Sequence, residues 1–185
     1  MLDAGARLLI DVGYGEFTTN HVAELAGVAI GSLYEYFPDK ETIVAEIVRR
    51  TVREIVEEVD RGLERAGGHD LESRLREWLH VMFAAVKVRR DLVRAISRDV
   101  PFLRDLDEVK TLQTTLLDVA TRGSHAVDSP LLRKNREAVI YLLTVMSGHA
   151  IVESVVARPR HLALQDVEAA FQHIIVTVLT ARPSA

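Results

Sequence analysis

The fold is decided by the stretch from Thr18 to Glu41, which reads TTNHVAELAGVAIGSLYEYFPDKE. Apolar residues recur at helical spacing on both sides of Gly27, the residue type that most readily adopts the left-handed conformation that ends a helix. Pro38 stops the second helical run, and Asp39 is placed to cap the next one. The stretch therefore predicts a helix-turn-helix, a unit whose second helix enters the major groove of DNA.

The apolar side chains of this stretch predict how its two helices pack. Val22, Leu25 and Ala26 form the expected inward stripe of the first helix. Val28 and Leu33 are expected to fill the wedge between the helices. The second helix then runs from about residue 29 to residue 37.

The outward residues of the same stretch suit contacts with DNA. A threonine caps the first helix, and small residues at the start of the second let its backbone approach the bases. Tyrosine hydroxyls can hydrogen-bond phosphates, and a lysine in the first turn of the third helix adds charge to a partly positive helix end. The candidate DNA-binding residues are Thr18, Thr19, Ala29, Ile30, Gly31, Ser32, Tyr34, Tyr36 and Lys40.

The segment from Leu2 to about Val48 closely resembles the DNA-binding head of the TetR (tetracycline-repressor) family of transcriptional regulators. The resembling residues are Gly13-Tyr14, Thr18-Thr19, Val22-Ala23, Leu25-Ala26-Gly27-Val28, Gly31-Ser32-Leu33-Tyr34, Tyr36-Phe37-Pro38 and Lys40-Glu41. The resemblance implies an all-helical homodimer that binds a palindromic operator in double-stranded DNA. It also implies a body that binds one small molecule, which typically releases the DNA.

The chain departs from the family pattern in two places, the start of the second motif helix and the start of the chain. Ala29 stands where the family often has a capping Ser or Thr, a loss of about 1 kcal/mol of local stability. Ile30 stands where some members carry Lys. Met1 falls inside what the family would count as its first helix, so we expect the usual short basic arm either to be absent or to lie upstream of Met1.

Charge sets the head apart from most DNA-binding domains. Residues 1–50 hold four basic and eight acidic side chains, a net charge of −4, and the remainder of the chain is neutral. Non-specific DNA affinity comes from neutralised phosphates. We therefore expect weak, strongly salt-dependent binding unless basic residues precede Met1.

Composition predicts an all-α fold. The chain has 185 residues, 48% of them hydrophobic, with 10 Gly, 5 Pro and no Cys. No alternating strand pattern occurs, and no apolar run reaches the ~18 residues of a membrane span. No signal peptide is recognisable, and we expect a cytoplasmic protein. Helical periodicity predicts about nine helices, with a head at residues 1–48 and a ligand-binding and dimerisation body at residues 49–185.

The last two predicted helices are apolar over a wide arc. A helix of this kind needs two partners: the core of its own subunit and, we expect, a second subunit around a two-fold axis. The alternative is that one subunit buries both helices completely. The predicted dimer residues are Leu142, Val145, Met146, Val152, Val155, Phe171, Ile174, Ile175 and Val178.

A ligand site is expected in the body, as the resemblance implies. Its candidates are Trp78, Met82, Phe83, Phe102, Leu106, Gln113, Leu116, Tyr141 and His149. The alternative is that these residues are ordinary core. Three of them place polar groups on apolar stripes, and a buried polar group needs a partner, either internal or a ligand. The clustered Trp78, Met82 and Phe83 favour a largely apolar effector.

No competing chemistry is supported by the sequence. Glu77 and His80 have the spacing of one half of a di-iron site, but such sites need two copies. His149 and Glu153 have no third metal ligand nearby. Without a nucleophile elbow, a zinc-protease motif or a phosphate loop, we predict no enzyme, metal or cofactor. The main alternative is a small-molecule-binding or dimerisation module whose head no longer grips DNA.

Overall fold

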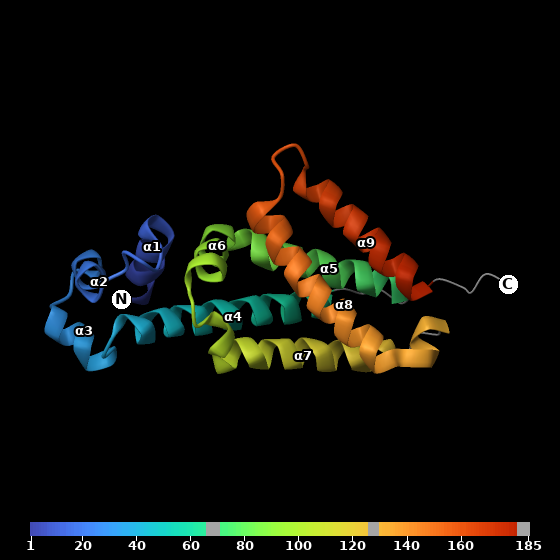
Figure 1. Ribbon diagram of the computed structural model, residues 1–185, viewed down its shortest axis with the longest axis horizontal. Helices are drawn as coiled ribbons and strands as arrows, with labels where there is room; N and C mark the ends of the chain where they lie inside the picture. The colour runs from blue at the N-terminus through green and yellow to red at the C-terminus, as the bar shows by residue number, and fades with distance from the viewer. Residues whose placement is uncertain (66–70, 126–129, 181–185) are drawn as a thin grey trace. The chain divides into compact units, whose positions relative to one another are not determined.

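The computed structural model describes residues 1–65, 71–125 and 130–180, and in this part of the chain every regular element is a helix, as predicted (Figure 1). Its elements are α1 (Leu2–Val12), α2 (Thr19–Ala26), α3 (Ile30–Tyr36), α4 (Lys40–Arg65), α5 (Leu71–Val88), α6 (Arg90–Asp99), the 3₁₀ turn η1 (Leu103–Asp105), α7 (Asp107–Ser124), α8 (Pro130–Ala157) and α9 (Leu164–Thr180). The sequence also favours Asp70 as the cap of α5 and a loop at residues 123–129, but Asp70 and most of that loop lie outside the described residues.

The chain divides into two compact units. One consists of Met1–Glu54 with Arg89–Lys110, and the other of Ile55–Val88 with Thr111–Ala185. The unit that carries the helix-turn-helix therefore also includes α6 and η1. The predicted boundary after residue 48 falls inside α4, which is continuous through both units.

The core of the first unit is built where α1 to α4 meet α6. Leu9, Phe17, Leu33, Ile43 and Ile47 are fully buried there. Gly5 brings α1 close to α4, since a Cβ at this position would lie 3.0 Å from Ile47 Cδ1. From α6 and its C-cap, the buried members of this core are Ala95, Ile96 and Val100.

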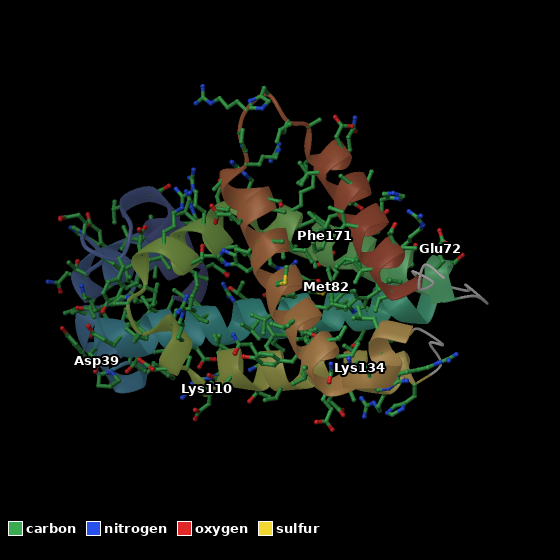
Figure 2. The ribbon with its side chains drawn as sticks, turned by 45° about the vertical axis from the view of Figure 1, so that its right-hand side comes forward. Asp39, Glu72, Met82, Lys110, Lys134 and Phe171 are labelled. Atoms are coloured by element: carbon green, nitrogen blue, oxygen red, sulfur yellow. The ribbon has the colours of Figure 1, made fainter. Side chains whose placement is uncertain are left out.

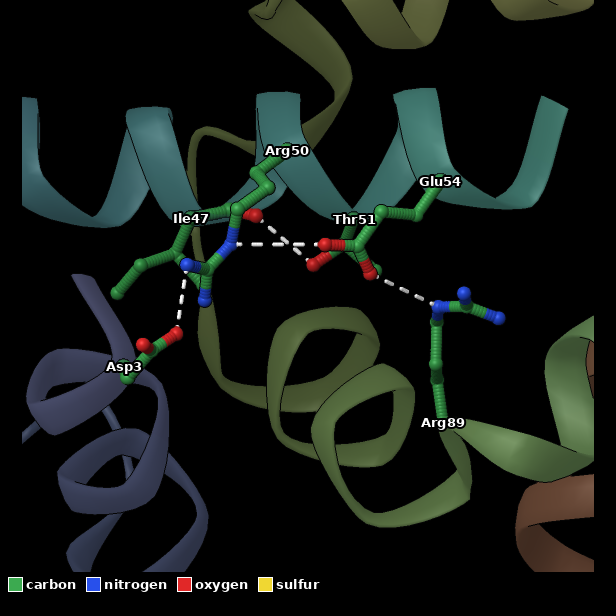
Figure 3. A network of polar contacts seen from close by, with 6 residues as sticks. All are labelled: Asp3, Ile47, Arg50, Thr51, Glu54 and Arg89. Carbon is green, nitrogen blue, oxygen red and sulfur yellow. Dashed lines mark hydrogen bonds and ion pairs between the residues drawn. The ribbon is translucent and has the colours of Figure 1, made fainter. Parts of the chain in front are cut away.

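A chain of ion pairs fastens α4 to its neighbours in this unit (Figure 3). Arg50 Nη1 lies 2.7 Å from Asp3 Oδ1 on α1, and Arg50 Nε lies 3.8 Å from Glu54 Oε1 one turn further along α4. The second oxygen of Glu54 accepts a hydrogen bond from Arg89 Nε at 3.1 Å, directly before α6. Each exposed pair alone is weak, but the linked set orients α1 and α6 on α4.

The second unit is held together by α5, α8 and α9, which pack against one another. Its buried residues include Leu79, Met82, Phe83, Ile151 and Leu179. The Phe83 and Phe171 rings meet edge to face with centroids 6.1 Å apart, and Figure 2 labels Met82 of α5 and Phe171 of α9 in this core. Gly62 of α4 lies directly against Val81, because a Cβ there would come within 2.5 Å of Val81 Cγ1.

Two sequence-based expectations about elements are corrected. Because proline is tolerated in the first turn of a helix, the sequence favours a helix that opens at Pro101, but Pro101 lies in a turn, and α7 begins only at Asp107. The intervening Phe102, Leu103 and Leu106 pack against the core of the first unit, so tertiary contacts interrupt the local helical pattern.

The second correction concerns hydropathy. An 18-residue window within the stretch Leu131–Ala157 of α8 has a mean hydropathy of 1.7, so this helix is long and apolar enough, by length and composition alone, to cross a membrane. Only 28% of that window is buried inside the protomer. The expectation that no stretch of this kind exists is wrong, because scattered polar residues do not lower the average enough.

Candidate DNA-binding site

The turn between α2 and α3 forms as its residues predict. The Thr18 side chain accepts a hydrogen bond from the His21 backbone N–H at 3.2 Å and caps α2. Gly27 has φ 67° and ψ 33°, the left-handed conformation, and its N–H bonds back to the end of α2. These predictions are confirmed, and together they set the direction in which α3 leaves the turn.

The inner face of the motif agrees with the prediction except at Leu25. Val22 and Leu33 are fully buried, and Val28 packs against the core. Leu25 is 46% exposed, so the expectation that it points inward is wrong. The buried face of α2 is centred between Val22 and Ala23, and at about 100° per residue Leu25 lies about 110° away from it.

The outer face of α3 is open and carries few charges. Tyr34 and Tyr36 are 50% and 67% exposed. Thr19 Oγ1 lies 3.1 Å from the Tyr34 hydroxyl, which links α2 to α3 on this face. A Cβ added at Gly31 would meet nothing within 4 Å. Further exposed residues on and before α3 are Ala29, Ile30 and Ser32.

The start of α3 lacks a side-chain cap, as the Ala at position 29 predicts. Ala29 is the N-cap of α3 and makes no side-chain capping hydrogen bond. The first backbone N–H groups of α3 therefore lack a side-chain acceptor from the cap. This end of α3 is left with donors and small side chains, which suits close approach to an anionic surface.

The start of α4 is joined to the end of α1 through Tyr14. Its hydroxyl donates to Glu41 Oε1 at 2.7 Å, and Lys40 Nζ donates to the Tyr14 carbonyl oxygen at 3.3 Å. Lys40 Nζ also lies 4.3 Å from the centroid of the Tyr14 ring. Lys40 is thus half-buried and already engaged, so its charge is held in place beside α4 rather than projecting freely.

The electrostatics of this joint have clear causes. Desolvation, the hydrogen bond to Glu41 and the charges of Glu41 and Asp39 raise the pKa of Tyr14 to about 12. Asp39 Oδ1 accepts hydrogen bonds from the hydroxyl and the backbone N–H of Thr42, at 2.6 and 2.7 Å. Both bonds lower the pKa of Asp39. The predicted cap of α4 is confirmed, whereas the bond between Tyr14 and Glu41 spans 27 residues and has no local sequence signal.

The predicted ligand residues are not brought together as one set. Met82 and Phe83 are buried in the second unit, with Trp78 and Leu116 half-buried. Phe102 and Leu106 instead pack in the first unit, where the Phe102 ring meets Tyr14 edge to face at 5.7 Å. The resulting set in the second unit is smaller and more apolar than expected.

The three polar ligand candidates are exposed, contrary to the expectation that burial would require partners for them. They are Gln113, Tyr141 and His149. Each lies on the outward side of α7 or α8. The protomer buries only part of the apolar stripe of these helices, and the three residues lie on the part that stays exposed. Tyr141 lies one turn before the exposed Val145 on α8 and shares its face.

The predicted dimer residues fall into exposed and buried groups. Leu142, Val145, Met146 and Ile174 are more than half exposed, which is unusual for such large apolar side chains on two neighbouring helices. Val152, Phe171 and Val178 are half-buried. Val155 and Ile175 are buried within the protomer, so for these two the expectation of an intersubunit contact is corrected.

Comparison with known proteins agrees with this architecture. Residues 1–47 match the family model described as "Bacterial regulatory proteins, tetR family". A putative TetR-family transcriptional regulator from Syntrophomonas wolfei superimposes with a TM-score of 0.73 at 17% identity, over 100% of this chain and 95% of that chain.

Two further similarities involve Bacillus subtilis. The fatty acid metabolism regulator protein of strain 168 is 27% identical over 64 residues, which are 35% of this chain and 33% of that protein. This matched stretch thus spans about a third of the relative's length. The structure of the transcriptional regulator FadR in complex with stearoyl-CoA superimposes with a TM-score of 0.70 at 16% identity, over 96% of both chains.

Proposed function

We propose that this chain is a transcriptional regulator that binds operator DNA as a homodimer, because residues 1–47 match the model of the tetR family of bacterial regulatory proteins and the chain has the fold of TetR-family regulators. The observation that carries this proposal is the outer face of α3. It presents small residues and two tyrosine hydroxyls to solvent on a rigid three-helix head. This face has the size and chemistry of a major-groove reader.

The proposed dimer contact is the exposed apolar surface of α8 and α9. Leu142, Val145, Met146 and Ile174 would be covered by the same residues of a second copy. One isolated head has low affinity for DNA, whereas two heads at a fixed spacing bind the two halves of a palindrome. Membrane insertion of α8 is disfavoured in this proposal, because the face that needs cover is one side of a helix packed on α5 and α9.

The proposed effector is a long-chain acyl compound. The core of the second unit is lined by apolar and aromatic side chains, among them Met82, Phe83 and Phe171. A structural neighbour of the same fold holds stearoyl-CoA, and a relative of the head is a regulator of fatty acid metabolism. Effector binding would shift α4, change the spacing of the two heads and release the operator, so the protein would act as a repressor.

The proposal is tested by DNA binding to the region upstream of the protein's own gene, at low and physiological salt, with and without stearoyl-CoA. We expect specific binding that stearoyl-CoA weakens at least tenfold, which corresponds to about 1.4 kcal/mol. A form extended upstream of Met1 is measured in parallel. Specific binding by the extended form alone would place a basic arm before Met1, and binding that stearoyl-CoA leaves unchanged would contradict the acyl effector.

A second function is favoured by one observation, the net charge of −4 on residues 1–50. An acidic head neutralises few DNA phosphates and therefore gains little DNA affinity from them. If neither form binds DNA at low salt while stearoyl-CoA still binds, the protein is a helical ligand-binding or dimerisation module with a head that no longer grips DNA.

A further inference from the structure

A single serine interrupts the buried stripe of α8. Ile140, Ser147, Ile151 and Val155 follow one another at spacings of seven and four residues, so they share one face of the helix. All four are buried, and α8 packs against α5 and α9. Ser147 therefore places a hydroxyl in a buried stripe that is otherwise apolar.

This hydroxyl differs from the other buried hydroxyls of the described residues. Thr51 donates to the Ile47 carbonyl oxygen at 2.8 Å. Ser124 donates to the Thr121 carbonyl oxygen at 2.7 Å and accepts from Arg136 Nη1 at 3.1 Å. Ser147 is 3% exposed, and its hydroxyl makes no hydrogen bond to any residue that the structure describes.

An unpartnered buried hydroxyl reduces the stability of the free protein. A side chain of this kind in a native core calls for an explanation, and a ligand that supplies the missing partner is one. Alanine would fill nearly the same volume without the polar atom. A serine at this position is therefore better explained by binding than by folding.

We propose that Ser147 is the polar anchor of the effector site and that its hydroxyl donates a hydrogen bond to the carbonyl oxygen of a bound acyl group. The inference rests on the proposed acyl effector and deepens it. One donor among apolar side chains suits a ligand with one carbonyl and a long hydrocarbon chain. Any charged part of the ligand has to lie outside these apolar surroundings, because a charge buried among them would be left unpaired.

The first test is thermal unfolding of the free protein with two matched substitutions. Ser147→Ala is expected to raise Tm by about 2–4 °C, because it removes an unsatisfied polar group. Ser124→Ala is expected to lower Tm by a similar amount, because it removes a partner of Arg136 and of the Thr121 carbonyl. Helix propensity favours alanine at both positions, so the opposite signs report on the hydroxyl partners. A fall in Tm for Ser147→Ala would overturn the proposal.

The second test measures binding of three probes: stearoyl-CoA, free stearate, and S-octadecyl-CoA, a thioether that lacks the carbonyl oxygen. Ser147→Ala is expected to weaken stearoyl-CoA binding about 5- to 10-fold, the loss of one hydrogen bond, and to leave the thioether unaffected. Equal effects on thioester and thioether would overturn the role of the carbonyl.

The remaining outcomes separate the two proposals. Wild-type binding of stearate that is tighter than that of stearoyl-CoA, and that Ser147→Ala weakens, would support the anchor and assign the site to free fatty acids. If the wild-type protein binds stearoyl-CoA and Ser147→Ala binds it equally well, the anchor fails while the acyl effector stands. If the wild-type protein binds none of the three probes, both fail.

Discussion

Gly31 is a residue at which folding and DNA binding can be separated. It lies in the first turn of α3, its backbone is not in the left-handed region, and an added side chain would meet no other atom of the protein within 4 Å. We expect Gly31→Gln to fold at least as stably as the wild type, because Gln is a better helix former than Gly. Operator affinity should fall at least tenfold, about 1.4 kcal/mol, because the new side chain occupies space between α3 and the bases.

The control for this substitution is Gly15→Gln. Gly15 is also open to solvent and not in the left-handed region, but it precedes α2 and lies outside both helices of the motif. Operator affinity and Tm of both variants are measured side by side. Equal losses of affinity for the two would show that α3 is not the reading helix.

Local chemistry explains which residues of the site could be predicted from the sequence. Thr18, Gly27 and Asp39 act on backbone groups within three or four residues, so their roles follow from neighbours in the chain. Leu25 and Tyr141 were misplaced because their burial depends on how wide an arc each helix hides. The unpartnered state of Ser147 depends on three helices at once, and no sequence pattern carries it.

At the scale of elements, the joint between α1 and α4 makes stability sensitive to alkaline pH. The pKa of Tyr14 is raised from 10.0 to about 12, so the folded state holds the phenolic proton more tightly than the unfolded state. The stabilisation of the folded state that results is fully present below pH 10 and is lost as pH rises through about 12. Ionised Tyr14 would also repel Glu41, to which the neutral hydroxyl donates.

The measurement is Tm of the wild type and of Tyr14→Phe from pH 8 to pH 12. Phenylalanine keeps the ring that packs on Phe102 and lies under Lys40. We expect the wild type to be the more stable below pH 10, with an advantage that shrinks steadily towards pH 12. An advantage that stays constant across this range would show that folding does not raise the pKa of Tyr14.

Packing between elements was only partly predictable. Helix existence and most boundaries follow from periodicity. The sequence predicts α8 from Pro130 to about Ala157 and α9 from about Gln165 to Ala181, and both begin and end within about two residues of these positions. The inclusion of α6 in the same unit as the helix-turn-helix was not predicted. It depends on apolar contacts with α1 and on the pair between Glu54 and Arg89, which are distant in sequence. Such non-local contacts leave no periodic signal.

At the scale of the whole molecule, the exposed apolar face of α8 carries the prediction of a homodimer. Val145 is 51% exposed and lies among Leu142, Met146 and Ile174 in the proposed contact. Val145→Glu would place a charge in the contact at about 2 kcal/mol per copy. Two-fold symmetry doubles that cost, so dimerisation should weaken about a thousandfold. Sedimentation velocity measures the loss of the dimer, and operator binding of the same samples measures its effect on DNA affinity.

The matched control is Val88→Glu, because Val88 is 72% exposed at the end of α5 and lies outside the proposed contact. It should remain a dimer with wild-type operator affinity. Val145→Glu should be a folded monomer that binds a single half-site weakly, since two heads no longer share the binding energy of one palindrome. If Val145→Glu stays dimeric and binds the operator normally, the contact lies elsewhere, and the exposed face of α8 would need another partner.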